Sequence, residues 1–102
     1  MLSIDRFNNM KIYEGDTDYL IIEIKNYELN TLDSITLNIG NVIKKTYTPV
    51  TKNKFLIPFL STDTKNKSGV YDYQLVFSSN RKSINTVIHS AKFTIIKTVG
   101  GY

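Results

Sequence analysis

His89, the one histidine of the chain, is the residue best suited to acid–base or metal chemistry. A catalytic histidine needs a partner group within reach, and a metal site needs further ligands. Ser90 is the nearest hydroxyl, but neighbouring residues of a strand point to opposite faces, so Ser90 does not serve His89. The 102 residues include no cysteine, which excludes thiol catalysis, disulfides and Cys-ligated metals. The sequence predicts no catalytic residue, no metal site and no cofactor.

Calcium binding is a second kind of chemistry to consider. Three carboxylates alternate with other residues near Gly15: Glu14, Asp16 and Asp18. A calcium loop needs more oxygen ligands at alternating positions than this run supplies. We instead expect a hairpin turn over Gly15, Asp16 and Thr17, in which Asp16 hydrogen-bonds its own backbone.

The net charge of +4 suggests nucleic-acid binding as a hypothesis. The basic residues fall mostly at expected loop tips and strand edges, and only two of the 13 are arginine, which reads bases and phosphates best. Tyr71, Tyr73 and Phe77 share a face with Leu75, so we expect these rings in the core rather than stacked on bases. The pattern favours solvated loops. A carbohydrate- or nucleic-acid-binding module remains the alternative, although the chain has no tryptophan for stacking on a sugar.

The elements that position these residues are strands. Thirty residues are β-branched (13 Ile, 6 Val and 11 Thr), against one Ala, three Glu and one Gln. Branching at Cβ suits a pleated strand and disfavours a helix. No apolar stretch approaches the roughly 20 residues that cross a membrane, so we expect no membrane partner.

Alternation of apolar and polar residues and the turn signals between them predict about seven short strands. The expected strands cover residues 10–13, 18–25, 34–39, 55–60, 70–77 and 86–99, the last as one strand or two. Gly40-Asn41 predicts a two-residue hairpin after the third of these. The run 55–60 is apolar on both sides, so we expect it to be buried on both faces or to lie in a contact. Pro58 removes a backbone donor, which favours a sheet edge or a bulge. We predict an N-terminal arm over 1–9, a sandwich over 10–98 and a tail over 99–102.

The first nine residues carry three apolar side chains, Leu2, Ile4 and Phe7. Such an arm adds as a strand to a neighbouring protein, forms the first strand of its own sheet, or caps the core. Tyr19 and Tyr47 are expected to project from strands, and tyrosine is enriched in interfaces. These five residues are the candidate partner-docking residues.

A second group of residues has the spacing of an immunoglobulin corner. Asp63 and Thr64 are followed by Gly69, Tyr71 and Tyr73. In immunoglobulin-like sandwiches a tyrosine at the start of the sixth strand hydrogen-bonds back to the upstream backbone, two residues before a cysteine. Tyr71 fits the corner position and Tyr73 the cysteine position, while Gly69 is expected to allow an approach that a side chain would block.

The chain resembles the N-terminal immunoglobulin-like domain of phage baseplate upper proteins and related phage virion modules. The matching pieces, in order, are residues 11–17, 55–58, 63–64, 69–75 and 91–95. They correspond to a basic-apolar turn ending in Gly-Asp-Thr (Gly15, Asp16, Thr17), an Asp-Thr…Gly-x-Tyr-x-Tyr corner and a closing strand. Ala91 stands where the family tends to have glycine.

The resemblance implies an all-β, immunoglobulin-like antiparallel sandwich without enzymatic activity. It further implies a structural or adaptor protein of a tailed-phage virion, made in the bacterial cytoplasm and present in several copies on a symmetric particle. Its partners would be the major capsid protein or baseplate and tail proteins. The family's domain normally heads a longer chain, and the module is expected here to stand alone. We therefore place a capsid auxiliary role slightly ahead of a baseplate or tail adaptor.

Overall fold

A computed structural model describes residues 2–25, 28–79 and 85–98, without the side chains of 85–87 and 89. The side chain of His89 and the predicted tail 99–102 therefore lie outside the described part of the chain. The described residues form eight strands and one short helix. These are β1 (Ser3–Ile4), β2 (Met10–Tyr13), β3 (Asp18–Glu23), β4 (Ser34–Ile39), β5 (Ile43–Tyr47), β6 (Lys54–Phe59), α1 (Ser61–Thr64), β7 (Gly69–Ser78) and β8 (Asn85–Ile96).

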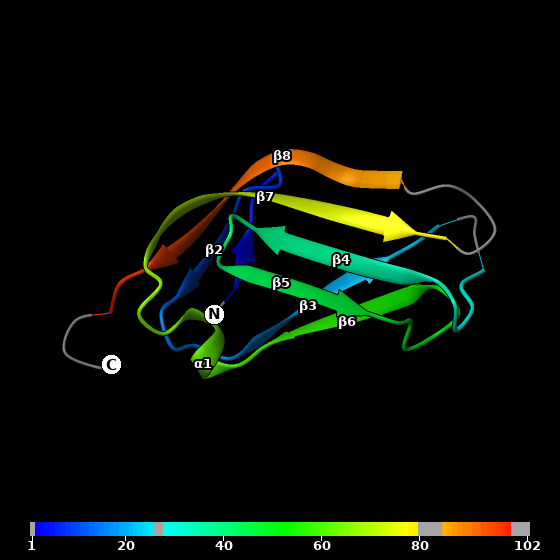
Figure 1. Ribbon diagram of the computed structural model, residues 1–102, viewed down its shortest axis with the longest axis horizontal. Coiled ribbons are helices and arrows are strands. Elements are labelled where there is room, and N and C mark those ends of the chain that lie inside the picture. The colour runs from blue at the N-terminus through cyan, green and yellow to red at the C-terminus, as the bar shows by residue number, and fades with distance from the viewer. Residues whose placement is uncertain (1, 26–27, 80–84, 99–102) are drawn as a thin grey trace.

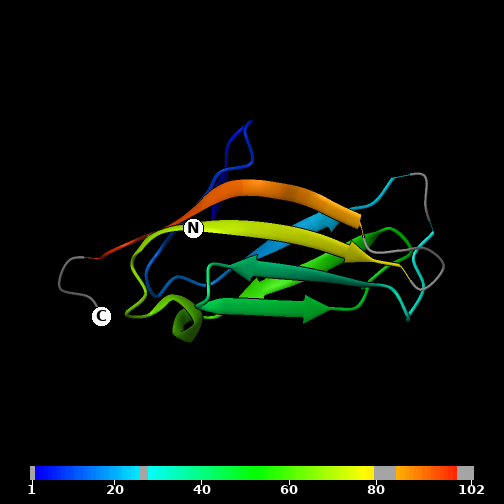
Figure 2. The ribbon, with the colours of Figure 1, turned by 45° about the horizontal axis from the view of Figure 1, so that its top comes forward.

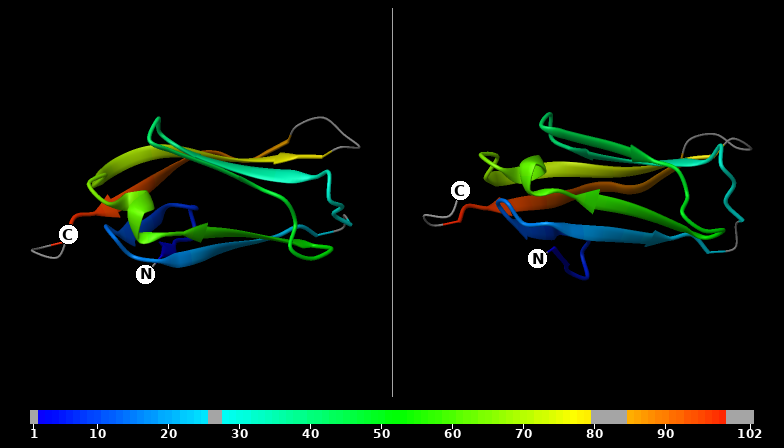
Figure 3. Two further views of the ribbon diagram at one scale, coloured as in Figure 1. Left: turned by 60° about the horizontal axis from the view of Figure 1, so that its bottom comes forward. Right: turned by 90° about the horizontal axis from the view of Figure 1, so that it is seen from below.

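The strands pack as two layers (Figure 1). The larger sheet has the order β1-β2-β8-β7-β4-β5, and the smaller sheet consists of β3 and β6. Figure 3 shows the small sheet lying across one face of the large one. Every pair is antiparallel except β2 with β8, which is parallel. The prediction of an all-β sandwich is confirmed.

The strand order is that of an immunoglobulin sandwich. The run β8-β7-β4-β5 corresponds to the G-F-C-C′ order of a variable-type large sheet, and β3 with β6 corresponds to the neighbouring B and E strands of the other sheet. The early strand β2 covers the residues 10–13 that the alternation predicted. In β7 the inward residues Tyr73, Leu75 and Phe77 are buried, as their shared face predicted.

Aromatic rings from both sheets fill the core between them. Phe59 of β6 stacks on Phe93 of β8 with 5.7 Å between ring centroids, and Tyr73 of β7 meets Phe93 edge-on at 6.1 Å. Phe55 of β6 contacts Phe77 of β7 edge-on at 6.0 Å. Such pairs stabilise a fold by about 0.5–1.5 kcal/mol beyond the area that they bury. These contacts fix the small sheet against the large one.

The corner before β7 forms as the sequence predicted. The Tyr71 hydroxyl donates a hydrogen bond of 2.7 Å to the Lys67 carbonyl, four residues upstream. The expected reason for Gly69 is wrong, because a Cβ there would lie 3.5 Å from the Tyr71 hydroxyl, an ordinary contact. Gly69 is needed for its backbone, whose φ of +147° side chains disfavour. The tight approach to Tyr71 is made by Gly40, whose added Cβ would lie 3.1 Å from Tyr71 Cδ1.

Two predicted turns differ from the structure. Ile39 pairs with Ile43, so the hairpin between β4 and β5 has three loop residues rather than two. The Gly15 turn is not a hairpin, because β2 belongs to the large sheet and β3 to the small one. It is a corner between layers, closed by a bond from Asp16 N to Tyr13 O (3.1 Å).

Candidate docking surface

The outer face of the small sheet carries a group of exposed and half-exposed apolar side chains. Alternation points Leu20 and Ile22 of β3 toward the core, which leaves the odd-numbered residues facing outward. Across the sheet Tyr19 is opposite Pro58, and Ile21 is opposite Leu56. Tyr19 is 61% exposed, Ile21 63% and Leu60, just after β6, 58%. We call this group the small-sheet face: Tyr19, Ile21, Leu56, Pro58 and Leu60.

The sequence singled out only part of this face. It named Tyr19, and it predicted a contact or double burial for 55–60. Double burial is wrong, because Leu56 and Pro58 are half-exposed and Leu60 is exposed. It missed Ile21. The signal for Ile21 was an apolar side chain at an outward position of an alternating strand.

The two strands of the small sheet also have open edges. Each has the other as its only partner strand among the described residues. On β6 the edge is blunted by Pro58, which has no N–H to donate, and by Lys54, whose charge disfavours pairing. The stretch of β3 from Tyr19 to Ile22 has neither proline nor lysine. Both strands carry charges at their ends, Asp18 and Glu23 on β3 and Lys54 on β6, and the β3 edge differs in having no proline.

A pocket of about 310 Å³ lies at one end of the small-sheet face, and we call it the Asp18 pocket. Its lining residues are Thr17, Asp18, Tyr19, Pro58, Phe59 and Leu60. Asp18 accepts hydrogen bonds from Leu2 N (2.6 Å) and Tyr19 N (2.7 Å). These bonds lower the pKa of Asp18, so its carboxylate is charged at neutral pH. The pocket combines apolar walls with one negative group.

The N-terminal residues form the first strand of the chain's own sheet, because β1 pairs antiparallel with β2. Residues 5–9 connect the two strands as a loop that projects from the sheet (Figure 2), and we call it the N-terminal loop. Asp5 Oδ1 accepts bonds from Phe7 N (2.8 Å) and Asn9 N (3.0 Å). The bond from Asn9 N is the main cause of a lowered pKa of Asp5. Phe7 is 67% exposed on this loop.

The structure separates the five predicted docking residues. Leu2 is half-buried against the core and reaches Asp18, next to Tyr19. Ile4 and Phe7 are exposed on β1 and the N-terminal loop. Tyr47 lies on β5, at the opposite edge of the large sheet, and packs partly against the core. Of the five residues, Leu2 is linked to the neighbourhood of Tyr19 through its bond to Asp18, and Ile4, Phe7 and Tyr47 lie on other elements.

The residues of the family motif serve the fold. Gly15 N donates to Thr64 Oγ1 (2.9 Å), which ties the corner between layers to α1. Asp63 accepts from Leu60 N (2.6 Å) and pairs with Lys45 (2.9 Å). Burial alone would raise the pKa of Asp63, but the Leu60 amide and the Lys45 ammonium outweigh it, so the pKa is lowered. Thr17 instead lines the Asp18 pocket.

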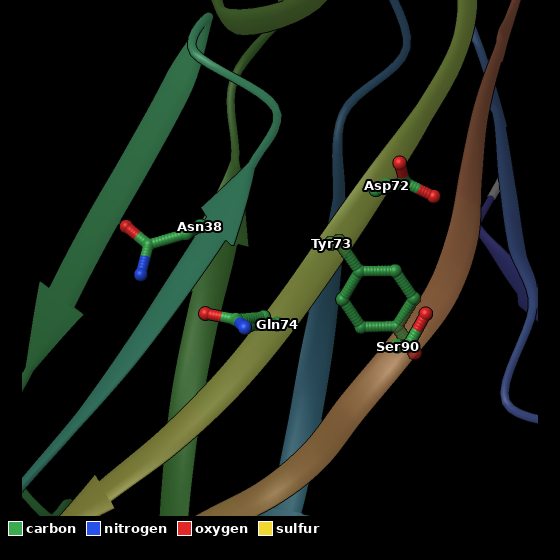
Figure 4. A pocket seen from close by; sticks show the side chains of 5 residues that line it. All are labelled: Asn38, Asp72, Tyr73, Gln74 and Ser90. Atoms are coloured by element: carbon green, nitrogen blue, oxygen red, sulfur yellow. The ribbon is translucent and has the colours of Figure 1, made fainter.

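A second depression, of about 300 Å³, lies on the outer face of the large sheet and is polar. It is lined by Asn38, Asp72, Tyr73, Gln74 and Ser90. In Figure 4 the Tyr73 ring lies between β7 and β8, while the amides of Asn38 and Gln74 lie on the other side of β7 from Ser90. Asp72 is engaged with Lys92 at 2.5 Å. These groups could hydrogen-bond a polar ligand, but they form no acid–base pair.

The described residues contain no group of three or more His, Cys, Asp and Glu placed to hold a metal ion. In the same part of the chain, no helix has the length and apolar character needed to cross a bilayer. Compared with family models, with curated proteins and with solved structures, the chain matched nothing in any of the three comparisons.

Proposed function

We propose that the protein is a non-enzymatic structural or adaptor subunit of a tailed-phage virion, which docks on a larger shell subunit. A capsid auxiliary role is placed slightly ahead of a baseplate or tail adaptor. The observation that carries the docking function is the small-sheet face, an apolar surface beside the open edge of β3. The virion assignment rests on the motif resemblance, within which the Tyr71 corner has the expected hydrogen bond.

The physical basis of docking is burial of this face by a rigid module. Burial of apolar surface contributes about 25 cal/mol for each Å² removed from water. The core contacts hold the two layers rigidly, so little ordering is needed on binding. Because a symmetric particle presents many sites, a modest single contact suffices when copies bind side by side.

The first test is the copy number of the chain in purified phage particles, measured by peptide mass spectrometry against the major capsid protein. Hundreds of copies would support the capsid auxiliary role, and a few dozen or fewer would support the tail or baseplate role. Absence from every particle would overturn the virion assignment.

A second test addresses the surface itself. Purified chain is added to particles that lack it, and bound chain is quantified after sedimentation. Ile21→Lys should reduce binding strongly, because it places a charge in the small-sheet face. Val50→Lys is the matched control, since Val50 is also exposed (59%) but lies in the connection between β5 and β6. Equal loss of binding in both variants would contradict the assignment of this face.

A further inference from the structure

The N-terminal loop is held in one shape although its tip is exposed. Besides the two bonds to the Asp5 carboxylate, Asp5 N donates to Asn9 O (2.9 Å) and Asn8 N donates to Asp5 O (3.1 Å). The loop is also fixed to the large sheet, because the Tyr73 hydroxyl donates to Asn8 O and Lys92 N donates to Asn9 Oδ1 (3.0 Å). A loop ordered in this way loses little conformational freedom on binding.

The loop presents an aromatic ring and a positive charge together. The Arg6 guanidinium lies 4.9 Å from the centroid of the Phe7 ring. Phe7 is 67% exposed, so it fills no cavity of its own chain. Aromatic and arginine side chains are the residues most often found at the energetic centre of protein interfaces.

The Asp18 pocket has the complementary properties. Its volume of about 310 Å³ exceeds the roughly 150 Å³ of a cavity known to hold benzene. Tyr19, Pro58 and Leu60 give it apolar walls. The Asp18 carboxylate supplies a negative charge that an incoming guanidinium can bind through two hydrogen bonds.

We propose that Phe7 of one copy of the chain inserts into the Asp18 pocket of a second copy, with Arg6 pairing with Asp18. The two copies form a two-fold dimer in which the N-terminal loop of each copy occupies the Asp18 pocket of the other. The bond from Leu2 N to Asp18 places the start of the N-terminal segment beside the pocket of its own chain. In a two-fold dimer the contact between loop and pocket is made twice. The inference concerns the free chain. The pocket shares Tyr19, Pro58 and Leu60 with the small-sheet face, so dimer formation and docking on a shell subunit would compete for these residues.

The test is the mass of the purified chain in solution from about 5 to about 500 µM, by light scattering and sedimentation. A concentration-dependent dimer is expected, and Phe7→Ala should weaken it about tenfold or more. Leu32→Ala, an exposed leucine before β4, is the matched control and should leave the dimer unchanged. A monomer at every concentration would overturn the proposal, as would a dimer that Phe7→Ala does not weaken.

Charge exchange tests the pairing directly. Arg6→Glu places two carboxylates together at both contacts of the dimer, and Asp18→Lys places two cations together, so each variant alone should be monomeric. Mixed together, the two variants should form a heterodimer, because the introduced glutamate meets the introduced lysine at one contact and the native pair forms at the other. Failure of the mixture to associate, with both variants folded by circular dichroism, would contradict the Arg6–Asp18 pair. If Asp18→Lys does not fold, Arg6→Glu and Phe7→Ala still decide the outcome, because both lie on the exposed loop.

Discussion

Two tyrosines of β7, two residues apart, use their hydroxyl groups in different parts of the fold. Tyr71 donates to Lys67 O and closes the corner that leads into the strand. Tyr73 donates to Asn8 O and holds the N-terminal loop against the large sheet. The first bond was predictable from spacing, because both partners lie within four residues. The second was not, since it joins residues 65 apart in the chain.

Tyr71→Phe should lower the free energy of unfolding by about 1 kcal/mol, the usual net contribution of one hydrogen bond. Urea unfolding followed by circular dichroism measures this change. Tyr13→Phe is the control and should have little effect, because Tyr13 is half-exposed. Equal effects of the two changes would mean that the corner bond does not stabilise the fold.

Burial, aided by the charge of Asp5, raises the pKa of Tyr73 from 10.0 to about 12. A group whose pKa is raised by folding contributes stability that is complete below the unfolded pKa and is lost as pH rises through the folded pKa. The stability of the protein should therefore fall between about pH 10 and pH 12. Tyr73→Phe should reduce that fall, which thermal melts across this range would show. An identical alkaline profile in the variant would contradict the assignment.

At the scale of elements, strand positions followed from local pattern, whereas turn geometry did not. Alternation located β2 and β4 at their observed bounds. The loop after β4 is one residue longer than expected, and in it Gly40 takes φ +51° and lies close to the Tyr71 ring. The Gly15 corner could not be distinguished from a hairpin, since the chain's assignment to one sheet or two depends on distant partners.

Gly40→Ala should destabilise the protein by about 1–2 kcal/mol, the cost of a left-handed conformation for a residue with a Cβ. The contact of 3.1 Å with Tyr71 Cδ1 adds to this cost. Asn41→Ala, the next residue of the same loop, is the control. Chemical unfolding of both variants measures the difference, and a Gly40→Ala protein as stable as the parent would contradict the assigned role of this glycine.

Two ion pairs of the fold differ in exposure and should therefore contribute differently to its stability. Lys45 and Asp63 are 11% and 22% exposed, whereas Lys92 and Asp72 are 59% and 74% exposed. Asp63→Asn should lower the free energy of unfolding, measured by urea unfolding, by about 1.5–3 kcal/mol, because a partly buried charged hydrogen bond is lost. Asp72→Asn should cost less than about 1 kcal/mol, as is usual for exposed pairs. Similar costs for the two variants would contradict this distinction.

At the scale of the whole molecule, the sandwich was predictable and the arrangement of its sheets was not. Composition and alternation are sufficient for an all-β class, because six of the eight strands of the described residues carry a local signal, whereas β1 and β5 do not. The division into six and two strands depends on which edges are covered, and no local pattern reports that. For the same reason the sequence found Tyr19 but missed Ile21: the outer face of β3 becomes a surface only because no further layer of the described residues covers it.

Acid stability is a property of the molecule as a whole, because folding shifts the pKa of three carboxylates in the same direction. The pKa values of Asp5, Asp18 and Asp63 are all lowered by folding from 3.8. Groups of this kind contribute stability that is present above the unfolded pKa and is lost as pH falls through the folded values. The melting temperature should therefore be steady above about pH 5 and should fall as the pH drops below 3.8. Melting temperatures that stay constant down to about pH 2 would contradict these shifts.

The position of β8 between β2 and β7 has a consequence for synthesis of the chain. A ribosome completes β2 at Tyr13, but β8 is not finished until Ile96, and translation proceeds at roughly 5–20 residues per second. For several seconds the nascent chain therefore carries β2 without its central partner, and β7 with one side unpaired. The large sheet closes only when the last strand inserts between two that are already made. We expect this to be a late event of folding, and until it occurs the nascent chain is exposed to chaperones and to aggregation.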